Sequence, residues 1–235
     1  MERILITGAN RGLGLGLVRR YLDLGGRRVF AACRQPDAAL ALNRLATQHS
    51  DRLTVIPLDV IDLDSIASAA ALVAAQVDGL DLLINNAGIN PKGNTQDFAT
   101  IRPETMLAVM AVNVVGPLMV VKGFVDLLKA GSKGRVVNIS SQMGSLTNRP
   151  NGGPYAYCAS KSALNMVTRT LAADLRPYGI TTVMVHPGWV QTDMGGANAP
   201  LTPETSSHSM VDFFATLEEK HNGLFYRWDG QPLPW

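Results

Sequence analysis

The sequence of 235 residues predicts an α/β fold in a single domain, with a doubly wound parallel sheet covered by helices on both faces. Short apolar runs alternate along the chain with longer segments of helical period, which is the pattern of repeated βαβ units. Several of the short runs are almost continuously apolar, as expected for parallel strands that are buried on both sides. No internal repeat, charge block or low-complexity linker marks a boundary, so we expect one domain over residues 1–235.

The strands and helices are predicted in alternating order along the chain. The predicted strands are Arg3–Thr7, Arg28–Ala32, Leu53–Leu58, Leu80–Asn85, Arg135–Ser140, Thr181–His186 and Leu224–Arg227. The predicted helices between them are Leu13–Leu24, Asp37–His49, Leu63–Val77, Pro103–Lys129 and Tyr155–Arg176. A further helix is expected after Thr202 and Pro203, because a capping threonine followed by a proline in the first turn is typical of a helix start.

Composition and charge exclude several classes of protein. The hydrophobic fraction is 46%, the charged fraction is 17% and the net charge is +2, so we expect neither a disordered chain nor a nucleic-acid-binding surface. Cys33 and Cys158 have no CxxC partner, and the four histidines lack metal-ligand spacing, so we expect no metal site. With no signal peptide and no apolar run that we judge long enough to span a bilayer, we expect a cytoplasmic protein with no membrane partner.

The stretch TGANRGLGLG, residues 7–16, places four glycines in the predicted turn between the first strand and the first helix. Each glycine costs conformational entropy on folding, but without a Cβ atom the backbone N–H groups can approach a phosphate at the positive end of the helix. The spacing Gly8-x3-Gly12-x-Gly14 therefore indicates a cradle for a pyrophosphate. Taken alone, it is explained equally well by a tight strand-to-helix connection.

A second motif, YAYCASKSALN, places Tyr157 and Lys161 four residues apart, so both side chains lie on one face of a helix. An isolated pair at this spacing would favour a half-buried tyrosine beside a solvated lysine. Three further motifs favour a ligand site instead, because each closes a predicted strand at the end where open α/β sheets bind ligands. They are INNAG at residues 84–88, VNISS at 137–141 and HPG at 186–188.

These motifs resemble the classical short-chain dehydrogenase/reductase family over essentially the whole chain. The resemblance rests on Thr7-Gly8-x3-Gly12-x-Gly14, Asn85-Asn86-Ala87-Gly88, Asn113, Ser141, Tyr157-x3-Lys161 and Pro187-Gly188, in this order. The stretches HPGWVQTDMGG and APLTPE and the terminal LPW resemble the branch of sniffer-type carbonyl reductases and C-factor-like proteins. The resemblance implies a Rossmann-type fold, a nicotinamide cofactor, and a homodimer built from the long apolar helix and the helix that carries Tyr157.

The resemblance implies that Asn113, Ser141, Tyr157 and Lys161 are catalytic. Tyr157 would be the general acid in reduction, and Lys161 would stabilise its anion, since a phenol of pKa ~10 is otherwise a poor proton relay near neutrality. Lys161 would also hold the ribose of the nicotinamide. Asn113 would anchor a proton-relay water, and a bond from its side chain to a neighbouring backbone group is compatible with that role.

Ser141 would donate a hydrogen bond to the substrate oxygen. Fifteen residues separate Ser141 from Tyr157, more than in many members of the family, so Ser140 and Ser145 are alternatives. His186, although it stands at a strand end, is expected to shape the nicotinamide loop rather than to act in catalysis.

The cofactor preference can be argued from charge. NAD-dependent enzymes of this architecture carry Asp or Glu at the end of the second strand, where this chain reads Ala32-Cys33-Arg34. Arg34 and Arg11 are suited to bidentate contact with a 2′-phosphate, so we expect NADPH/NADP⁺ rather than NADH. The alternative is that both arginines are ordinary solvated residues.

The remaining cofactor contacts follow from family similarity. Asp59 would contact the adenine amine, residues 86–88 would pack beside the adenosine ribose, and Thr192 would reach the carboxamide. The complete predicted set is Gly8, Asn10, Arg11, Gly12, Leu13, Gly14, Arg34, Asp59, Val60, Asn86, Ala87, Gly88, Tyr157, Lys161, Pro187, Gly188, Val190 and Thr192.

A substrate-binding loop and helix are expected around residues 189–221. Met143, Trp189 and Met194 would give the substrate pocket apolar and aromatic walls, and residues 195–201 would form a mobile lid. An equally good role for Trp189 is to close over the cofactor alone.

The function predicted is NADPH-dependent reduction of small hydrophobic aldehydes, ketones or quinones to alcohols. One alternative is a pathway-specific NAD(P)-dependent alcohol dehydrogenase. Another is a C-factor-like dinucleotide-binding signalling protein, although the intact Asn113, Tyr157 and Lys161 argue against a purely noncatalytic scaffold.

Overall fold

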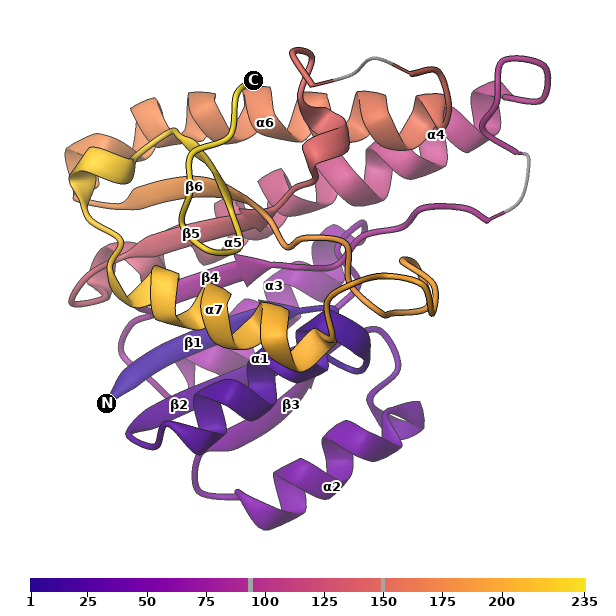
Figure 1. Ribbon diagram of the computed structural model, residues 1–235. Helices are drawn as coiled ribbons and strands as arrows, with labels where there is room; N and C mark the ends of the chain where they lie inside the picture. The colour runs from indigo at the N-terminus through magenta and orange to yellow at the C-terminus, as the bar shows by residue number, and fades with distance from the viewer. Residues whose placement is uncertain (93–94, 149–150) are drawn as a thin grey trace.

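A parallel sheet forms the centre of the computed structural model, which describes residues 1–92, 95–148 and 151–235 (Figure 1). Its strands lie in the order β3-β2-β1-β4-β5-β6-β7. All the neighbouring pairs are parallel. The strands span β1 (Glu2–Thr7), β2 (Arg27–Cys33), β3 (Leu53–Pro57), β4 (Leu82–Asn85), β5 (Arg135–Ile139), β6 (Thr181–His186) and β7 (Phe225–Arg227). The predicted fold class is confirmed, and each predicted strand is present to within two residues at either end.

In the part of the chain that the structure describes, seven α-helices connect or flank these strands. They are α1 (Gly12–Asp23), α2 (Leu40–Gln48), α3 (Leu63–Ala74), α4 (Pro103–Met110), α5 (Gly116–Ala130), α6 (Tyr155–Leu175) and α7 (Pro203–Ala215). The last begins where the sequence predicted, because the side chain of Thr202 accepts a hydrogen bond from the backbone N–H of Thr205 and Pro203 opens the first turn.

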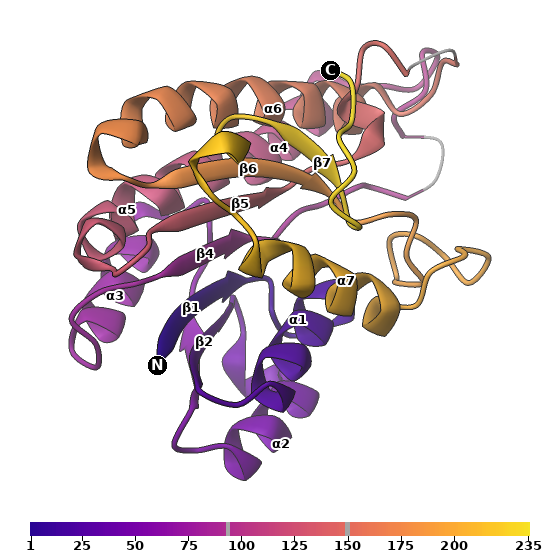
Figure 2. The ribbon, with the colours of Figure 1, turned by 60° about the vertical axis from the view of Figure 1, so that its left-hand side comes forward.

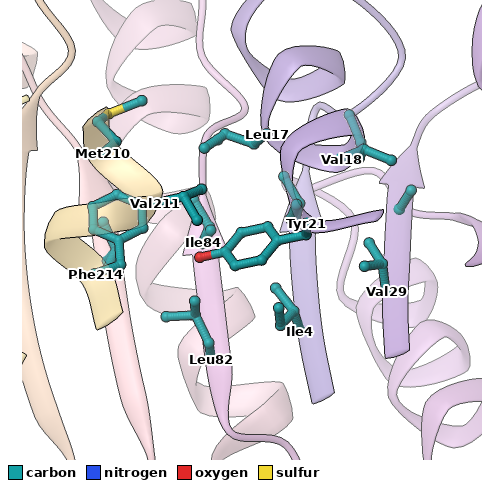
Figure 3. Close-up of a cluster of buried hydrophobic side chains, with 14 of the residues drawn as sticks. Ile4, Leu17, Val18, Tyr21, Val29, Leu82, Ile84, Met210, Val211 and Phe214 are labelled. Carbon is teal, nitrogen blue, oxygen red and sulfur yellow. The ribbon is translucent and has the colours of Figure 1, made fainter. Parts of the chain in front are cut away.

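Helices α1 and α7 lie on one face of the sheet, and α3 and α5 lie on the other (Figure 2). The two core layers follow from the alternation of side chains along each strand. In β1, Ile4 and Ile6 belong to the first layer, and Leu5, between them, belongs to the second. Figure 3 shows the first layer, where Tyr21 of α1 and Phe214 of α7 lie over the strands.

Two predicted helices are interrupted. The helix expected over Asp37–His49 is a short 3₁₀ turn, Pro36–Ala38, followed by α2, and Ala39 between them leaves the helical conformation. The helix expected over Pro103–Lys129 contains a π-helical segment, Ala111–Val115, between α4 and α5. Pro117 accounts for the second interruption, because it has no N–H to donate to the carbonyl of the residue four positions earlier.

The helical run from Pro103 to Ala130 is long and apolar enough to cross a membrane by length and composition alone, although the sequence analysis identified no such run. In the structure this run is part of the fold, since α4 contacts α6 and α5 contacts α3 and β4. Val120, Val121 and Phe124 are buried in the second core layer. Packing within the fold therefore explains the apolar residues on the buried side of this run.

The strand order places the two halves of the sheet on either side of the boundary between β1 and β4. From β1 the chain runs outward through β2 to β3, and from β4 it runs in the opposite direction through β5, β6 and β7. The loops that leave the carboxyl ends of β1 and β4 therefore diverge, which opens a crevice for a ligand at this edge.

Candidate active site

A cavity of about 1020 Å³ lies at the carboxyl edge of the sheet. All the predicted cofactor-binding residues and all the predicted pocket residues line it, and Ser141 does so too. The cavity is larger than most small-molecule sites and is wide enough for an extended ligand. Asn113 is the one predicted catalytic residue that is not part of the cavity wall.

The glycine-rich turn lines the cavity. Gly8 and Gly12 adopt positive φ angles of 63° and 51°, which L-residues with a Cβ rarely adopt. A Cβ atom on Gly14 would clash with the carbonyl oxygen of Gly8, so this glycine lets α1 begin directly against the end of β1. No side chain caps the first turn of α1 and no acidic residue lies in it, so its N–H groups are available to a ligand.

The fourth glycine of the stretch has a different explanation. A Cβ atom on Gly16 would lie 3.1 Å from the carbonyl oxygen of Pro203 and 3.1 Å from the hydroxyl of Ser207. Gly16 therefore permits close packing of α1 against α7, and it is not among the residues that line the main cavity.

Tyr157 and Lys161 lie on the inner wall of the cavity, on the first two turns of α6. Their relative exposures are only 8% and 5%. The Nζ atom of Lys161 donates to the carbonyl oxygen of Ile139 at 2.8 Å and lies 5.6 Å from the centroid of the Tyr157 ring. The predicted convergence of these two side chains is therefore present in the structure.

Burial changes the protonation of both groups in the same direction, toward the neutral form. It raises the pKa of Tyr157 to about 12, although a hydrogen bond with the Ser141 side chain acts in the opposite direction. Burial also lowers the pKa of Lys161 to about 8. Near neutral pH, the site therefore holds a protonated phenol beside a lysine that is still largely charged.

The three candidate serines occupy different environments. Ser141 is hydrogen-bonded to Tyr157 and accepts a hydrogen bond from the backbone N–H of Met143. Ser140 donates its hydroxyl to Asn165 in the interior, at 2.6 Å. Ser145 accepts from the backbone N–H of Asn148 and does not line the cavity. Of the three, Ser141 is the one placed beside the phenol.

Asn113 is fully buried in the π-helical segment, and its side chain is bonded to protein groups. It accepts from the backbone N–H of Ile89 at 2.8 Å, and it donates to the carbonyl of Ile89 at 2.8 Å and to the hydroxyl of Ser160 at 3.1 Å. The backbone role that the sequence analysis considered is thus present. Asn113 ties the loop after β4 to α6, one residue before Lys161.

The two predicted 2′-phosphate arginines have different surroundings. Arg34, immediately after β2, is exposed at the cavity wall. Arg11 forms an ion pair with Asp193 at 2.5 Å, and both side chains are about 70% exposed, at 72% and 70%. This pair connects the glycine-rich turn to the loop after β6. Asp193, which is 182 residues from Arg11 along the chain, was not among the residues predicted for the site.

The loop after β6 is held by its own hydrogen bonds. Trp189 donates its indole N–H to the carbonyl of Gly195 at 2.7 Å, and Gly195 donates its backbone N–H to the hydroxyl of Thr192. A β-bridge joins Val190 to Leu201 at the base of the loop. Motion of this loop as a lid stays a prediction.

Of two further polar residues at the site, Gln96 was missed from the sequence, and His186 was expected only to shape the nicotinamide loop. Gln96 is 3% exposed and bonds to the backbone N–H of Tyr157. His186 lines the cavity, burial lowers its pKa to about 4, and its Nδ1 atom has no hydrogen-bond partner. Among residues 1–92, 95–148 and 151–235, no cluster of three or more metal-ligating side chains occurs.

Comparisons with known proteins agree with this arrangement. Residues 2–200 match the family model described as short chain dehydrogenase. The C-signal protein of Myxococcus xanthus is 41% identical over 156 residues, which cover 66% of this chain and 93% of that protein.

Two solved structures superpose on the whole chain. The carbonyl reductase Sniffer of D. melanogaster is 40% identical, with a TM-score of 0.95 and complete coverage of both chains. The NADPH-bound carbonyl reductase from chicken fatty liver is 38% identical, with a TM-score of 0.94, and the match covers 100% of this chain and 99% of that one. On its fold, its strand-end motifs and these matches, the chain belongs to the short-chain dehydrogenase family of oxidoreductases.

Proposed function

We propose that this protein is an NADPH-dependent carbonyl reductase that acts on small hydrophobic aldehydes, ketones or quinones. The observation that carries the proposal is the arrangement of Ser141, Tyr157 and Lys161 on the wall of one cavity whose nucleotide end is lined by Arg34 and Arg11. Both solved relatives are carbonyl reductases by name, and one of them is bound to NADPH.

The residues at the cavity fit a phosphorylated dinucleotide. The uncapped start of α1 offers N–H groups to a pyrophosphate, and the missing Cβ of Gly14 lets the backbone come close. No carboxylate stands at the end of β2, where a ribose 2′-hydroxyl would need one, and Arg34 stands there instead. The guanidinium groups of Arg34 and Arg11 would hold a 2′-phosphate.

NADPH, when bound, supplies the hydride for the carbonyl carbon. The protein would then supply the proton and the orientation. The hydroxyl of Ser141 donates to the carbonyl oxygen of the substrate and orients it, and Tyr157 transfers its phenolic proton to that oxygen as negative charge develops. The ammonium group of Lys161, fixed on the carbonyl of Ile139, favours the phenolate that remains.

The substrate end of the cavity supports an apolar class of substrate. Met143, Trp189 and Met194 line it, and these side chains offer contact area and few hydrogen bonds. A sugar would leave its hydroxyl groups unpaired against such walls, at a cost for each one. We therefore expect aldehydes, ketones and quinones to be better substrates than sugars.

The test is a substrate panel assayed with NADPH and with NADH. We expect oxidation of NADPH with a reactive dicarbonyl, a quinone and an aromatic aldehyde, weaker rates with NADH, and no rate with aldose sugars. Preferred turnover of sugars would contradict the substrate class. Equal efficiency with both cofactors would contradict the assignment of NADPH.

The similarity to C-signal supports a second candidate, a signalling protein that binds a dinucleotide. The two functions can be separated by expressing Tyr157→Phe in cells that lack the wild-type protein. A cellular phenotype that survives the loss of turnover would favour the signalling function.

We also propose a homodimer that uses the helices from α4 to α6. Leu107, Val115 and Met166 are 70%, 50% and 66% exposed on this side of the molecule, which favours a covered surface. Light scattering after size exclusion should give a mass twice that of one chain, which is 25.2 kDa. The variant Met166→Glu should have the mass of one chain.

A further inference from the structure

We propose that Gln96 is a positioning residue for Tyr157, and this inference rests on the proposed reductase function. Gln96 lies in the irregular segment between β4 and α4, and its relative exposure is 3%. A buried glutamine is costly unless its amide is fully bonded, so its partners indicate what it does.

The first partner is the start of the catalytic helix. The Oε1 atom of Gln96 accepts a hydrogen bond from the backbone N–H of Tyr157 at 2.9 Å, and its own carbonyl accepts from the N–H of Tyr155 at 3.0 Å. The residue that precedes α6 is Pro154, whose side chain provides no cap. Gln96 therefore performs, from 61 residues earlier in the chain, the task of an N-cap residue.

The second partner is the cavity wall. The Nε2 atom of Gln96 donates to the Oδ1 atom of Asn90 at 2.8 Å and to the carbonyl oxygen of Pro91 at 2.9 Å. Asn90 lines the cavity beside Ile89. One amide thus connects the wall formed by residues 89–91 to the backbone of the proposed proton donor, and it uses one acceptor and two donors to do so.

The side-chain amide of Asn113 makes a second connection of the same kind, between the loop after β4 and α6. Asn113 joins Ile89 to Ser160, and Gln96 joins Asn90 and Pro91 to Tyr157. Two buried amides therefore connect the loop of residues 89–91 to α6 at two points, the hydroxyl of Ser160 and the backbone N–H of Tyr157. Asn113 fixes the turn near Lys161, and Gln96 fixes the turn that carries the phenol.

The consequence for catalysis is geometric. The Tyr157 side chain must meet the substrate oxygen while Lys161 stays on Ile139, and a shift of the first turn of α6 would separate the two. Misplacement of a reacting group by about 1 Å costs on the order of 100-fold in rate. Gln96 touches neither substrate nor cofactor in this account, so it acts through the backbone of Tyr157.

The test compares Gln96→Met, which keeps the length and removes the polar atoms, with Gln96→Glu, which keeps an acceptor for the Tyr157 N–H. Gln48→Met is the matched control, because Gln48 is an exposed glutamine on α2. For each variant we would measure kcat with a reactive dicarbonyl, the Kd for NADPH, the unfolding midpoint, and amide hydrogen exchange over residues 155–161.

We expect Gln96→Met to lower kcat by about 10- to 100-fold and to speed exchange over the first turn of α6. The Kd for NADPH should stay within about twofold, because the glycine-rich turn and Arg34 lie on other elements. Gln96→Glu should recover part of kcat and of the protection, and Gln48→Met should match the wild type.

Each contrary result has a definite meaning. If the wild type is active and Gln96→Met has the same kcat, the positioning role is wrong and the proposed function stands. Unchanged exchange over residues 155–161 overturns the capping contact whatever the activity. A fall in the unfolding midpoint with normal kcat in the folded protein shows a structural role only. A wild type that binds NADPH but reduces no carbonyl overturns the proposed function, and the positioning role falls with it.

Discussion

The ammonium nitrogen of Lys161 lies 5.6 Å from the centre of the Tyr157 ring, and both side chains are almost completely buried. Lys161 is held there by the carbonyl of Ile139, at the end of β5, so the sheet fixes the charge and α6 supplies the phenol. This relationship makes the protonation of Lys161 the first quantity to test.

The value of kcat/KM for NADPH should fall as the pH rises through about 8. The pKa of Lys161 is lowered by burial to about 8, so the side chain is charged below this pH and neutral above it. The pKa of Tyr157 is raised to about 12, so the proton donor stays protonated over the same range. The measurement is kcat/KM for NADPH from pH 6 to pH 10, since this ratio reports groups of the free enzyme.

The control for this profile is Lys161→Arg, which carries a charge throughout the range. Any activity that it retains should show no decrease at pH 8. A wild-type profile that is flat to pH 10 would show that the charge on Lys161 does not control kcat/KM for NADPH.

Arg34→Ala should weaken the binding of NADPH by about 1.5–3 kcal/mol and leave that of NADH nearly unchanged, because only NADPH has a 2′-phosphate for the guanidinium to bind. The two Kd values can be measured by quenching of protein fluorescence. Arg44→Ala removes an exposed arginine of α2 that does not line the cavity, and it should change neither value. Equal losses for both cofactors in Arg34→Ala would show that the residue does not contact a 2′-phosphate.

Asp193→Asn should strengthen the binding of NADPH. Arg11 pairs with Asp193, so the arginine must leave this partner, or share it, to reach a 2′-phosphate. Both groups are largely exposed, and such pairs contribute at most about 1 kcal/mol, so the gain should not exceed about fivefold. Calorimetric titration at low and high salt measures it, and the difference between variant and wild type should shrink at high salt. Weaker NADPH binding in the variant would show instead that the ion pair helps to form the site.

Asp81 should be the acidic residue whose loss destabilises the fold most. Its carboxylate, 4% exposed, accepts hydrogen bonds from the backbone and guanidinium of Arg3 and from the backbone and hydroxyl of Ser132. Asp81→Ala leaves these donors unpaired and should cost about 3–5 kcal/mol in the free energy of unfolding. Asp126→Asn, at a side chain 93% exposed, should cost almost nothing, and similar losses in both variants would refute the argument.

The same carboxylate predicts a loss of stability in acid. The Arg3 guanidinium and the N–H and O–H donors hold the pKa of Asp81 well below its usual range, even though burial acts in the opposite direction. A group whose pKa is depressed by folding stabilises the protein above its unfolded pKa of about 4, and this contribution is lost as the pH falls toward the folded value. Urea unfolding at pH 7 and pH 3 should therefore show wild type and Asp81→Ala converging at the lower pH.

The fold could be predicted from the sequence because its signals are local. The continuous apolar run Thr181–His186 forms β6 with the predicted bounds, and the Thr202-Pro203 pair begins α7 as predicted. The break at Ala39 and the π-helical segment around Asn113 were missed, because the helices were predicted from the periodicity of side chains, which continues through both. Pro117, which accounts for the π-helical segment, was a local signal that the prediction overlooked.

The site was predictable where its residues stand at strand ends and was not where distant segments meet. Ser141 ends a strand motif, whereas Gln96 lies in a polar segment without periodicity, and its partner Tyr157 is 61 residues away. Gly16 was grouped with the phosphate-binding glycines because it is close in sequence, but it contacts α7. Tertiary contacts of this kind leave no mark in one sequence.

The role of Tyr157 as proton donor is tested by NADPH oxidation by Tyr157→Phe beside the wild type, with a reactive dicarbonyl or quinone as substrate. Only the hydroxyl is removed, so the fold and the Kd for NADPH should be unchanged while kcat falls by about 100- to 10,000-fold. Circular dichroism and NADPH titration confirm the first part of this expectation. A Tyr157→Phe enzyme with near-normal turnover would contradict the assignment of Tyr157 as proton donor and, with it, the proposed mechanism.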